Sequence, residues 1–224
     1  MPQRQDCPGP PVQLIPKSNA TAGLLAHIAV SKFADGLPLY RQQKIFDRLG
    51  IEISRAATAK WLIQAARCCA LLIALLRQEI RSGPLINIDE SPLQVLNEAG
   101  RRNTSKSYMW VYRGGGPDRP VLLYQYHCYV EDGRLRPDNI LVENAIRPFV
   151  VGRKNWLFAG SPEGAAASAT FFSLIETAKA NGLEPYGYLR HIFKQLPLVQ
   201  TEQDLRDLLP HNIHPDDIAL TAQD

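Results

Sequence analysis

Several common functional signals are missing from this chain of 224 residues. Its four cysteines form no C-x-x-C pair, so reduced thiols are the expectation. No P-loop, G-x-S-x-G or G-x-G-x-x-G motif is present, which leaves nucleotide-driven chemistry without support. The longest apolar stretch, residues 65–76, is interrupted by Arg67 and falls short of the roughly 20 residues that span a bilayer. We therefore expect no membrane partner.

The composition is that of a folded protein. Hydrophobic residues make up 45% of the chain and charged residues 21%, which argues against wholesale disorder. A net charge of +3 does not by itself indicate a polyanionic partner, so a nucleic-acid site must be argued from the positions of the charges. The polar, proline-rich residues 1–16 lack the apolar core of a secretion signal, and we expect a cytoplasmic protein.

The first third of the chain, residues 19–83, has the apolar spacing of helices. The expected boundaries are Thr21 and Asp35-Gly36 for the first helix, Pro38 and Gly50 for the second, and Ser54 and Gly83 for a long third. The second helix, the turn and the third helix resemble a helix-turn-helix, which would place Arg55 and Lys60 on a DNA-recognition helix. An ordinary packed pair of helices explains the same pattern.

The pattern changes to that of strands after Pro84. Residues 84–96, 107–113 and 120–126 are short, apolar and rich in β-branched or aromatic residues, and a glycine-rich loop at 114–118 separates the last two. Consecutive strands joined by such turns usually pair as neighbours, so we predict one antiparallel meander.

Helices are expected again towards the C-terminus, at residues 165–180, 185–193 and 202–209. Thr201 should cap the last of them, with Asp204 in the capping-box position. The predicted fold class is α+β, with a helical N-terminal part, an antiparallel sheet and a helical C-terminal element.

Two carboxylates have positions that suit metal chemistry. Asp89 ends an apolar strand, and Glu143 stands just before a run of cations. If they meet, their hard oxygen ligands can hold divalent metals. The alternatives are a strand-ending aspartate satisfied by a turn and a helix-surface glutamate paired with Arg147.

The cations after Glu143 are candidates for phosphate contacts. The segment contains Arg147, Arg153, Lys154 and Asn155 beside the aromatic Trp156. The alternative is a solvated basic loop in which Trp156 anchors the core.

The histidines and cysteines offer only weak metal-binding signals. His211 and His214 form an H-x-x-H without a partner cluster, and Cys7 has no nearby ligand. We assign no zinc.

Seven stretches of the chain, within about 11–212, resemble the insertion sequence 66 family of bacterial transposases. They are LPLYRQQ (37–43), DESPLQVL (89–96), YMWVYR (108–113), ENAIRP (143–148), GRKNWLF (152–158), SLIETAK (173–179) and PYGYL (185–189). Their number and order make coincidence an unsatisfactory explanation.

The resemblance implies a DDE transposase with a ribonuclease-H-like fold. In that family three acidic residues hold two Mg²⁺ (or Mn²⁺) ions that drive nicking at transposon ends and attack of the freed 3′ hydroxyl on target DNA. Asp89 matches the family's first catalytic aspartate and Glu143 its final glutamate. The implied partners are double-stranded DNA at transposon ends and other transposase subunits.

The sequence departs from the family pattern in two places. The middle aspartate has no counterpart, because Tyr126 and Glu143 are only 143 − 126 = 17 positions apart and Asp132 and Asp138 match the segment directly before the glutamate. Residues 1–18, with Cys7, resemble the remnant of an upstream zinc-binding region. The resemblance therefore implies an N-terminal truncation and an internal deletion.

The predicted organisation has four parts: an extended lead-in at 1–18, a helical DNA-binding-like region at 19–83, a partial ribonuclease-H-like core at 84–160 and a helical C-terminal element at 161–224. The first functional hypothesis is a transposase-family protein with impaired strand cleavage and transfer. The second is a catalytically dead DNA-binding remnant that competes with full-length transposase or joins it. The third is a metal-dependent nuclease without specificity for transposon ends.

Overall fold

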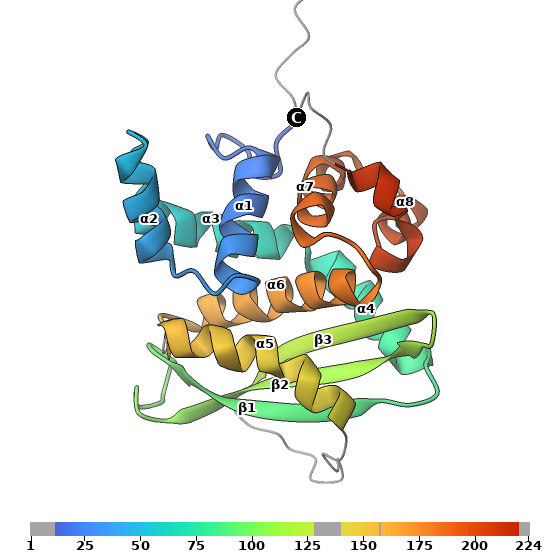
Figure 1. The fold of residues 1–224 in the computed structure, drawn as a ribbon. Helices are drawn as coiled ribbons and strands as arrows, with labels where there is room; N and C mark the ends of the chain where they lie inside the picture. Colours follow the sequence, from blue (N-terminus) through green and yellow to red (C-terminus); the bar gives the residue numbers. More distant parts are fainter. Residues whose placement is uncertain (1–11, 128–139, 157, 220–224) are drawn as a thin grey trace, which may run out of the picture.

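A computed structural model describes residues 12–127, 140–156 and 158–219. Most of the helices gather on one side of a four-stranded sheet (Figure 1). The helices are α1 (Ala22–Phe33), α2 (Leu39–Arg48), α3 (Arg55–Cys68), α4 (Ala70–Ser82), α5 (Ile140–Trp156), α6 (Pro162–Ala180), α7 (Pro185–Gln195) and α8 (Glu202–Asp207). The strands are β1 (Asn87–Val95), β2 (Lys106–Gly116), β3 (Arg119–His127) and β4 (Phe158–Ala159). This arrangement confirms the predicted α+β class.

Side-chain caps begin the first and third helices where the sequence predicts them. The Thr21 hydroxyl accepts a hydrogen bond from Leu24 N at 3.2 Å, and the Ser54 hydroxyl accepts one from Ala57 N at 3.2 Å. Each cap satisfies an amide that the first helical turn leaves without an intrahelical acceptor. Pro38 precedes α2 rather than forming its first turn.

The single long helix predicted from Ser54 to Gly83 is wrong. The chain bends by 53° between α3 and α4, at the fully buried Cys69. The bend lets α3 pack on α1 and α6, while α4 packs on β2 and β3. The apolar pattern continues through the bend because both helices face the same core, and periodicity alone therefore cannot locate it.

No single helix of the described residues is long and apolar enough to cross a membrane. The bent pair α3 and α4 passes that test only when the two are joined. Four residues of α4, namely Leu72, Leu75, Leu76 and Ile80, are buried in the protein core.

The three predicted strands form the predicted antiparallel meander. The strand order is β3-β2-β1-β4, with β1 pairing β2 and β2 pairing β3 in antiparallel fashion. The predicted loop at 114–118 is shorter than expected, because β2 continues through its glycines to Gly116 and β3 begins at Arg119. Gly115 has a φ of +86°, a backbone conformation that glycine adopts without strain.

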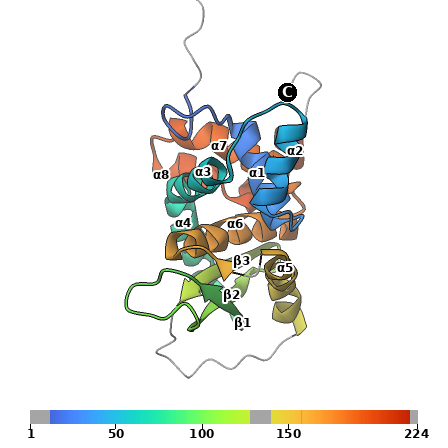
Figure 2. The same cartoon turned by 90° about the vertical axis from the view of Figure 1, so that its left-hand side faces the viewer.

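One edge of the sheet belongs to β3, and helix α6 seals it. Figure 2 shows α6 between the sheet and helices α1, α3 and α7. The hydroxyl of Thr177 accepts from Leu122 N at 3.1 Å, and that of Ser173 accepts from Tyr124 N at 2.8 Å. Asn181 donates to Pro120 O at 2.9 Å. These side chains recur every four residues, so they follow one face of the helix along the strand.

Helix α5 was not predicted. The sequence suggested a basic aromatic segment and a loop there. Pro148 lies inside the helix, where it removes a backbone hydrogen bond. Ala145, Ile146 and Phe149 are buried, and α5 packs on β1 and β2. Tertiary packing of this apolar face overrides the local penalty of the proline.

The C-terminal helices follow the prediction closely. Helix α6 begins at Pro162, three residues before the expected start, with the Ser161 hydroxyl accepting from Gly164 N at 3.1 Å. The capping box of α8 is confirmed, with Thr201 and Asp204 each bonding to the other's backbone amide.

Candidate metal and nucleic-acid site

Asp89 lies on β1, the first strand of the meander as predicted, rather than in a turn, but it does not end the strand, which continues to Val95. Its alternating neighbours Ser91, Leu93 and Val95 are all buried, so Asp89 faces the same, helix-covered side of the sheet. Its side chain is half-buried, and Oδ1 accepts a hydrogen bond from Glu90 N at 2.8 Å. The other carboxylate oxygen has room for a further ligand.

A cross-strand row links Asp89 to the helix that carries Glu143. Asp89 is paired with Val111 on β2, and Val111 is paired with Tyr124 on β3. The Tyr124 hydroxyl donates a hydrogen bond to the backbone carbonyl of Ala145 on α5. Burial raises the pKa of Tyr124 well above its usual value, which keeps the hydroxyl protonated as a donor. The row that holds Asp89 thus anchors α5 two residues beyond Glu143.

Glu143 is an exposed side chain near the N-terminus of α5. The helix dipole favours a carboxylate at this end. Within 12–127, 140–156 and 158–219, no group of three or more histidine, cysteine, aspartate or glutamate side chains gathers at one place. Asp132 and Asp138, the aspartates weighed against the missing middle ligand, lie outside the described residues.

Arg153 reaches from α5 to the outer edge of β1. Its guanidinium donates a hydrogen bond to the backbone carbonyl of Pro92. A hollow of about 380 Å³ lies beside this contact and is lined also by Gln94 and Lys106. Arg153 keeps further donors for a phosphate, and Lys106 adds a cation that the sequence did not single out.

Arg147 occupies a second hollow, on the opposite side of α5 from the buried face. This hollow has a volume of about 350 Å³, and its lining includes Asn144, Arg147 and Lys179. Arg147 and Lys179 come from α5 and α6, so two helices contribute a cation each. Asp35 lines the same hollow, and Lys179 forms an ion pair with Glu176 at 2.9 Å, so nearby carboxylates partly offset these two cations.

Lys154 and Asn155 lie in the last turn of α5 and are both exposed. The Asn155 amide nitrogen lies 2.7 Å from where a Cβ on Gly36 would be, so it packs against the turn between α1 and α2. Gly36 has a φ of +66° and provides both the turn and the space. The predicted DNA contact Asn155 therefore also has a structural role.

Arg55 and Lys60 are exposed on α3. Five positions separate them, which puts their side chains roughly 140° apart around the helix axis. α2 and α3 pack against each other, as a helix-turn-helix or an ordinary helical pair would. In Figure 1 this pair lies among the upper helices, and Leu62 of α3 lines one small pocket with Leu93 of β1 and Phe149 of α5.

The two C-terminal histidines, His211 and His214, have different surroundings. Burial lowers the pKa of the half-buried His211. His214 is exposed, with Nδ1 at 3.3 Å from Asp216 Oδ2. Cys7 lies outside the described residues.

A polar network around Glu98 was missed by the sequence analysis. Glu98 is only 8% exposed, and its Oε2 forms an ion pair with Arg101 Nη1 at 3.0 Å. The hydroxyls of Ser107 and Tyr126 also donate to its carboxylate. These residues fasten the connection between β1 and β2, and no motif marks them.

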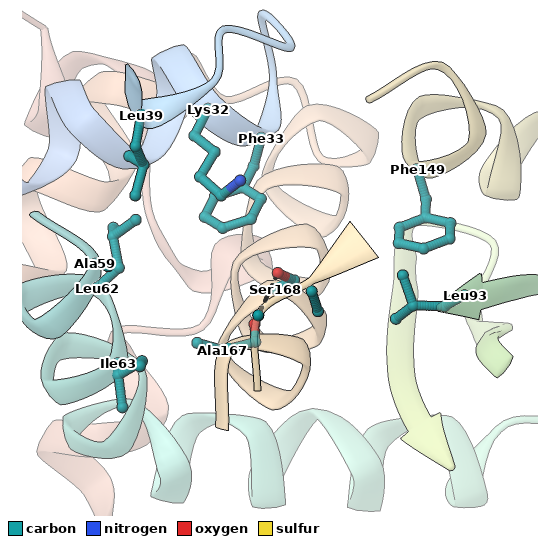
Figure 3. Close-up of a pocket in the computed structure, with 13 residues that line it drawn as sticks. Lys32, Phe33, Leu39, Ala59, Leu62, Ile63, Leu93, Phe149, Ala167 and Ser168 are labelled. Atoms are coloured by element: carbon teal, nitrogen blue, oxygen red, sulfur yellow. Dashed lines mark hydrogen bonds between the residues drawn. The ribbon is translucent and has the colours of Figure 1, made fainter. Parts of the chain in front are cut away.

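A small, mostly apolar pocket of about 160 Å³ lies between the helices and the sheet. Figure 3 shows the side chain of Lys32 extending into it beside the ring of Phe33, with Leu93 and Phe149 on the far side. The ammonium lies 5.1 Å from the centre of that ring. Burial lowers the pKa of Lys32 to about 8 because the apolar walls disfavour its charged form.

Comparison with known families assigns the chain. A family model described as "Transposase IS66 family" matches residues 17–128 and 127–167, and one described as "IS66 C-terminal element" matches residues 173–211. The chain belongs to the IS66 transposase family. The first match is in two parts that meet at residues 127–128, where the sequence analysis placed the internal deletion.

Similar proteins come from Sinorhizobium fredii (strain NBRC 101917 / NGR234). The uncharacterized protein y4qI is 37% identical over 129 residues, which are 55% of this chain and 23% of y4qI. The uncharacterized protein y4jD is 39% identical over 97 residues, 43% of this chain and 19% of y4jD. The chain thus spans less than a quarter of the length of either relative. No solved structure matches the chain.

Proposed function

We propose that this chain is a DNA-binding member of the IS66 family whose ribonuclease-H-like site is incomplete and poorly active in strand cleavage. One observation supports this most strongly. Asp89 stands on the helix-covered face of β1, and the row of residues to which it belongs anchors α5, the helix of Glu143 and the cations. Asp89 and Glu143, which the resemblance matches to the first and last acidic residues of the family, thus come from two elements that pack together.

The residues suit a divalent metal only in part. Asp89 and Glu143 offer hard carboxylate oxygens of the kind that Mg²⁺ prefers. Such a metal, when bound, would activate a water or hydroxyl and stabilise the leaving oxygen of a phosphodiester. Two carboxylates are too few to fix two metals, and Asp89 already accepts a backbone hydrogen bond. We therefore expect weak metal binding.

Phosphate contacts are assigned to the cations around α5. Arg153 and Lys106 line one hollow, and Arg147 and Lys179 line another, so cations flank the helix on two sides. Lys154 extends the group at the end of the helix. A polyanionic backbone that crosses α5 would meet several of these side chains and release counterions from each phosphate.

Salt-dependent binding tests this proposal. A labelled 30-base-pair duplex is titrated with the protein across a salt series, and fluorescence anisotropy gives the affinity. The double variant Arg153→Ala with Lys154→Ala should weaken binding by about tenfold or more. The slope of log affinity against log salt concentration should become shallower by the equivalent of about two phosphate contacts.

The matched control is Arg55→Ala with Lys60→Ala, which removes the same charge from α3. This variant should bind nearly as well as the parent chain. The reverse result, with loss only on α3, would move the DNA site to the helix-turn-helix-like pair and refute the assignment to α5.

The second hypothesis, a DNA-binding protein without any catalysis, is favoured by the absence of a three-acid cluster from the described residues. It differs from the proposal only in residual activity. Cleavage assays separate the two, and comparison of transposon ends with unrelated DNA separates both from a general nuclease.

A further inference from the structure

The outer edge of β1 is unpaired over residues 87–93 among the described strands. Its backbone hydrogen-bonding groups there have no strand partner. β4 lies on this side but pairs with β1 only at Gln94 and Val95. Leu96 N donates to Ala159 O of β4 at 2.9 Å. The amides of even-numbered residues in β1 therefore point to the outer edge. Backbone groups alternate between the two edges of a strand, so the amide of Glu90 and the carbonyl of Pro92 face the same outer edge.

Residues of the candidate site itself cover these groups. The Glu90 amide donates to the carboxylate of Asp89, and the Pro92 carbonyl accepts from Arg153. Proline at position 92 removes one further edge amide. Charged side chains and proline are the usual means of protecting an edge strand from pairing. Side-chain caps of this kind can be exchanged for a strand without disturbing the β1–β2 ladder.

The family match indicates what would occupy this edge. Its two parts meet at residues 127–128, between β3 and α5, so this chain lacks a segment that a longer family member has at that point. The similar protein y4qI is more than four times as long as the part that matches. Relatives such as y4qI are long enough to carry such a segment outside the part that matches.

We propose that the outer edge of β1 accepts an extended segment of a longer IS66-family chain, paired as an added strand beside Glu90. The inference deepens the proposed function, on which it rests, by naming the partner. Strand addition supplies affinity through main-chain hydrogen bonds. The added strand would bond to the Glu90 amide and the Pro92 carbonyl, and so it would replace the side chains that now cover them.

Strand addition would also change the site. Asp89 would lose its hydrogen bond to Glu90 and regain both oxygens for a metal, while Arg153 would be released for a phosphate.

The experiment uses this chain and purified y4qI. Hydrogen–deuterium exchange of the peptide spanning 86–93 is measured with and without y4qI, together with the affinity of the two proteins. Slower exchange in that peptide is expected. Glu90→Pro removes the edge amide and should weaken the complex by about tenfold or more, whereas Glu90→Ala keeps the amide and should change the affinity by about twofold or less.

Proline is tolerable here because Pro92 already occupies an equivalent outward-facing position on β1. Unchanged circular dichroism and unchanged DNA affinity would show that Glu90→Pro has not unfolded the chain. Equal affinity of the two variants for y4qI, or unchanged exchange at 86–93, would overturn the inference. Self-association that Glu90→Pro abolishes would overturn it too, by assigning the edge to a second copy.

The two proposals fail separately. Loss of DNA binding with an intact complex would refute the proposed DNA-binding function and leave the strand-accepting edge. Normal DNA binding without a complex would refute the edge alone.

Discussion

The two edges of the sheet are covered in different ways. At β3, the buried side chains of Ser173 and Thr177 satisfy the strand amides and belong to a helix packed throughout the core. At β1, the half-buried Asp89 and Arg153 cover one edge group each. The first edge is part of the hydrophobic core, while the second is capped by two charged side chains that belong to the candidate metal and phosphate site. Candidate function accordingly concentrates at β1.

The largest effect on stability is expected at the β3 edge. Ser173→Ala combined with Thr177→Val leaves the amides of Leu122 and Tyr124 buried without acceptors. Each unsatisfied buried group costs about 1–3 kcal/mol, so the pair should lower the free energy of unfolding by about 3 kcal/mol. Urea denaturation of the double variant and the parent chain measures this loss in the free energy of unfolding. A loss below about 1 kcal/mol would show that water or another group replaces the hydroxyls.

A smaller loss is expected from the carboxylate of Glu98, near the end of β1. Glu98→Ala leaves Arg101 and the hydroxyls of Ser107 and Tyr126 without their shared acceptor, which should cost about 2 kcal/mol. Glu98→Gln keeps one acceptor oxygen and should cost less. Equal losses in the two variants would mean that packing, rather than the charge and its hydrogen bonds, explains the effect.

The β1 cap should matter least for stability. Arg153→Ala exposes the Pro92 carbonyl at the protein surface, where water can replace the guanidinium, so we expect a cost below about 1 kcal/mol. Arg153→Lys serves as the control that keeps the charge. A loss as large as that at the β3 edge would contradict the description of β1 as an exchangeable edge.

Much of the fold is predictable because local signals agree with tertiary packing. The strand composition of residues 84–96 and the helix caps at Thr21 and Ser54 are short-range patterns, and the structure confirms them. Helix α5 and the bend at Cys69 depend on long-range contacts. Proline at position 148 opposes a helix locally, whereas packing of Phe149 against the sheet side stabilises it.

The candidate site is predictable only in part. The sequence placed Asp89 on the first strand of the meander, and the structure agrees, but the strand continues past Asp89 to Val95. It could not show that Arg153 crosses to Pro92 or that Tyr126 reaches Glu98, because those pairs lie 61 and 28 positions apart along the chain. The pairing of Asp89 with Glu143 in a metal site stays a prediction.

Strand cleavage tests the central claim most directly. The purified chain is incubated with Mg²⁺ or Mn²⁺ and with duplexes that carry or lack the element's ends, and Asp89→Ala is the control. Misplacing reacting groups by about 1 Å can cost on the order of a hundredfold in rate, and losing a metal ligand is a harsher change. We expect DNA binding with no cleavage above the Asp89→Ala background. Cleavage that disappears in Asp89→Ala would contradict it and show that the site is complete.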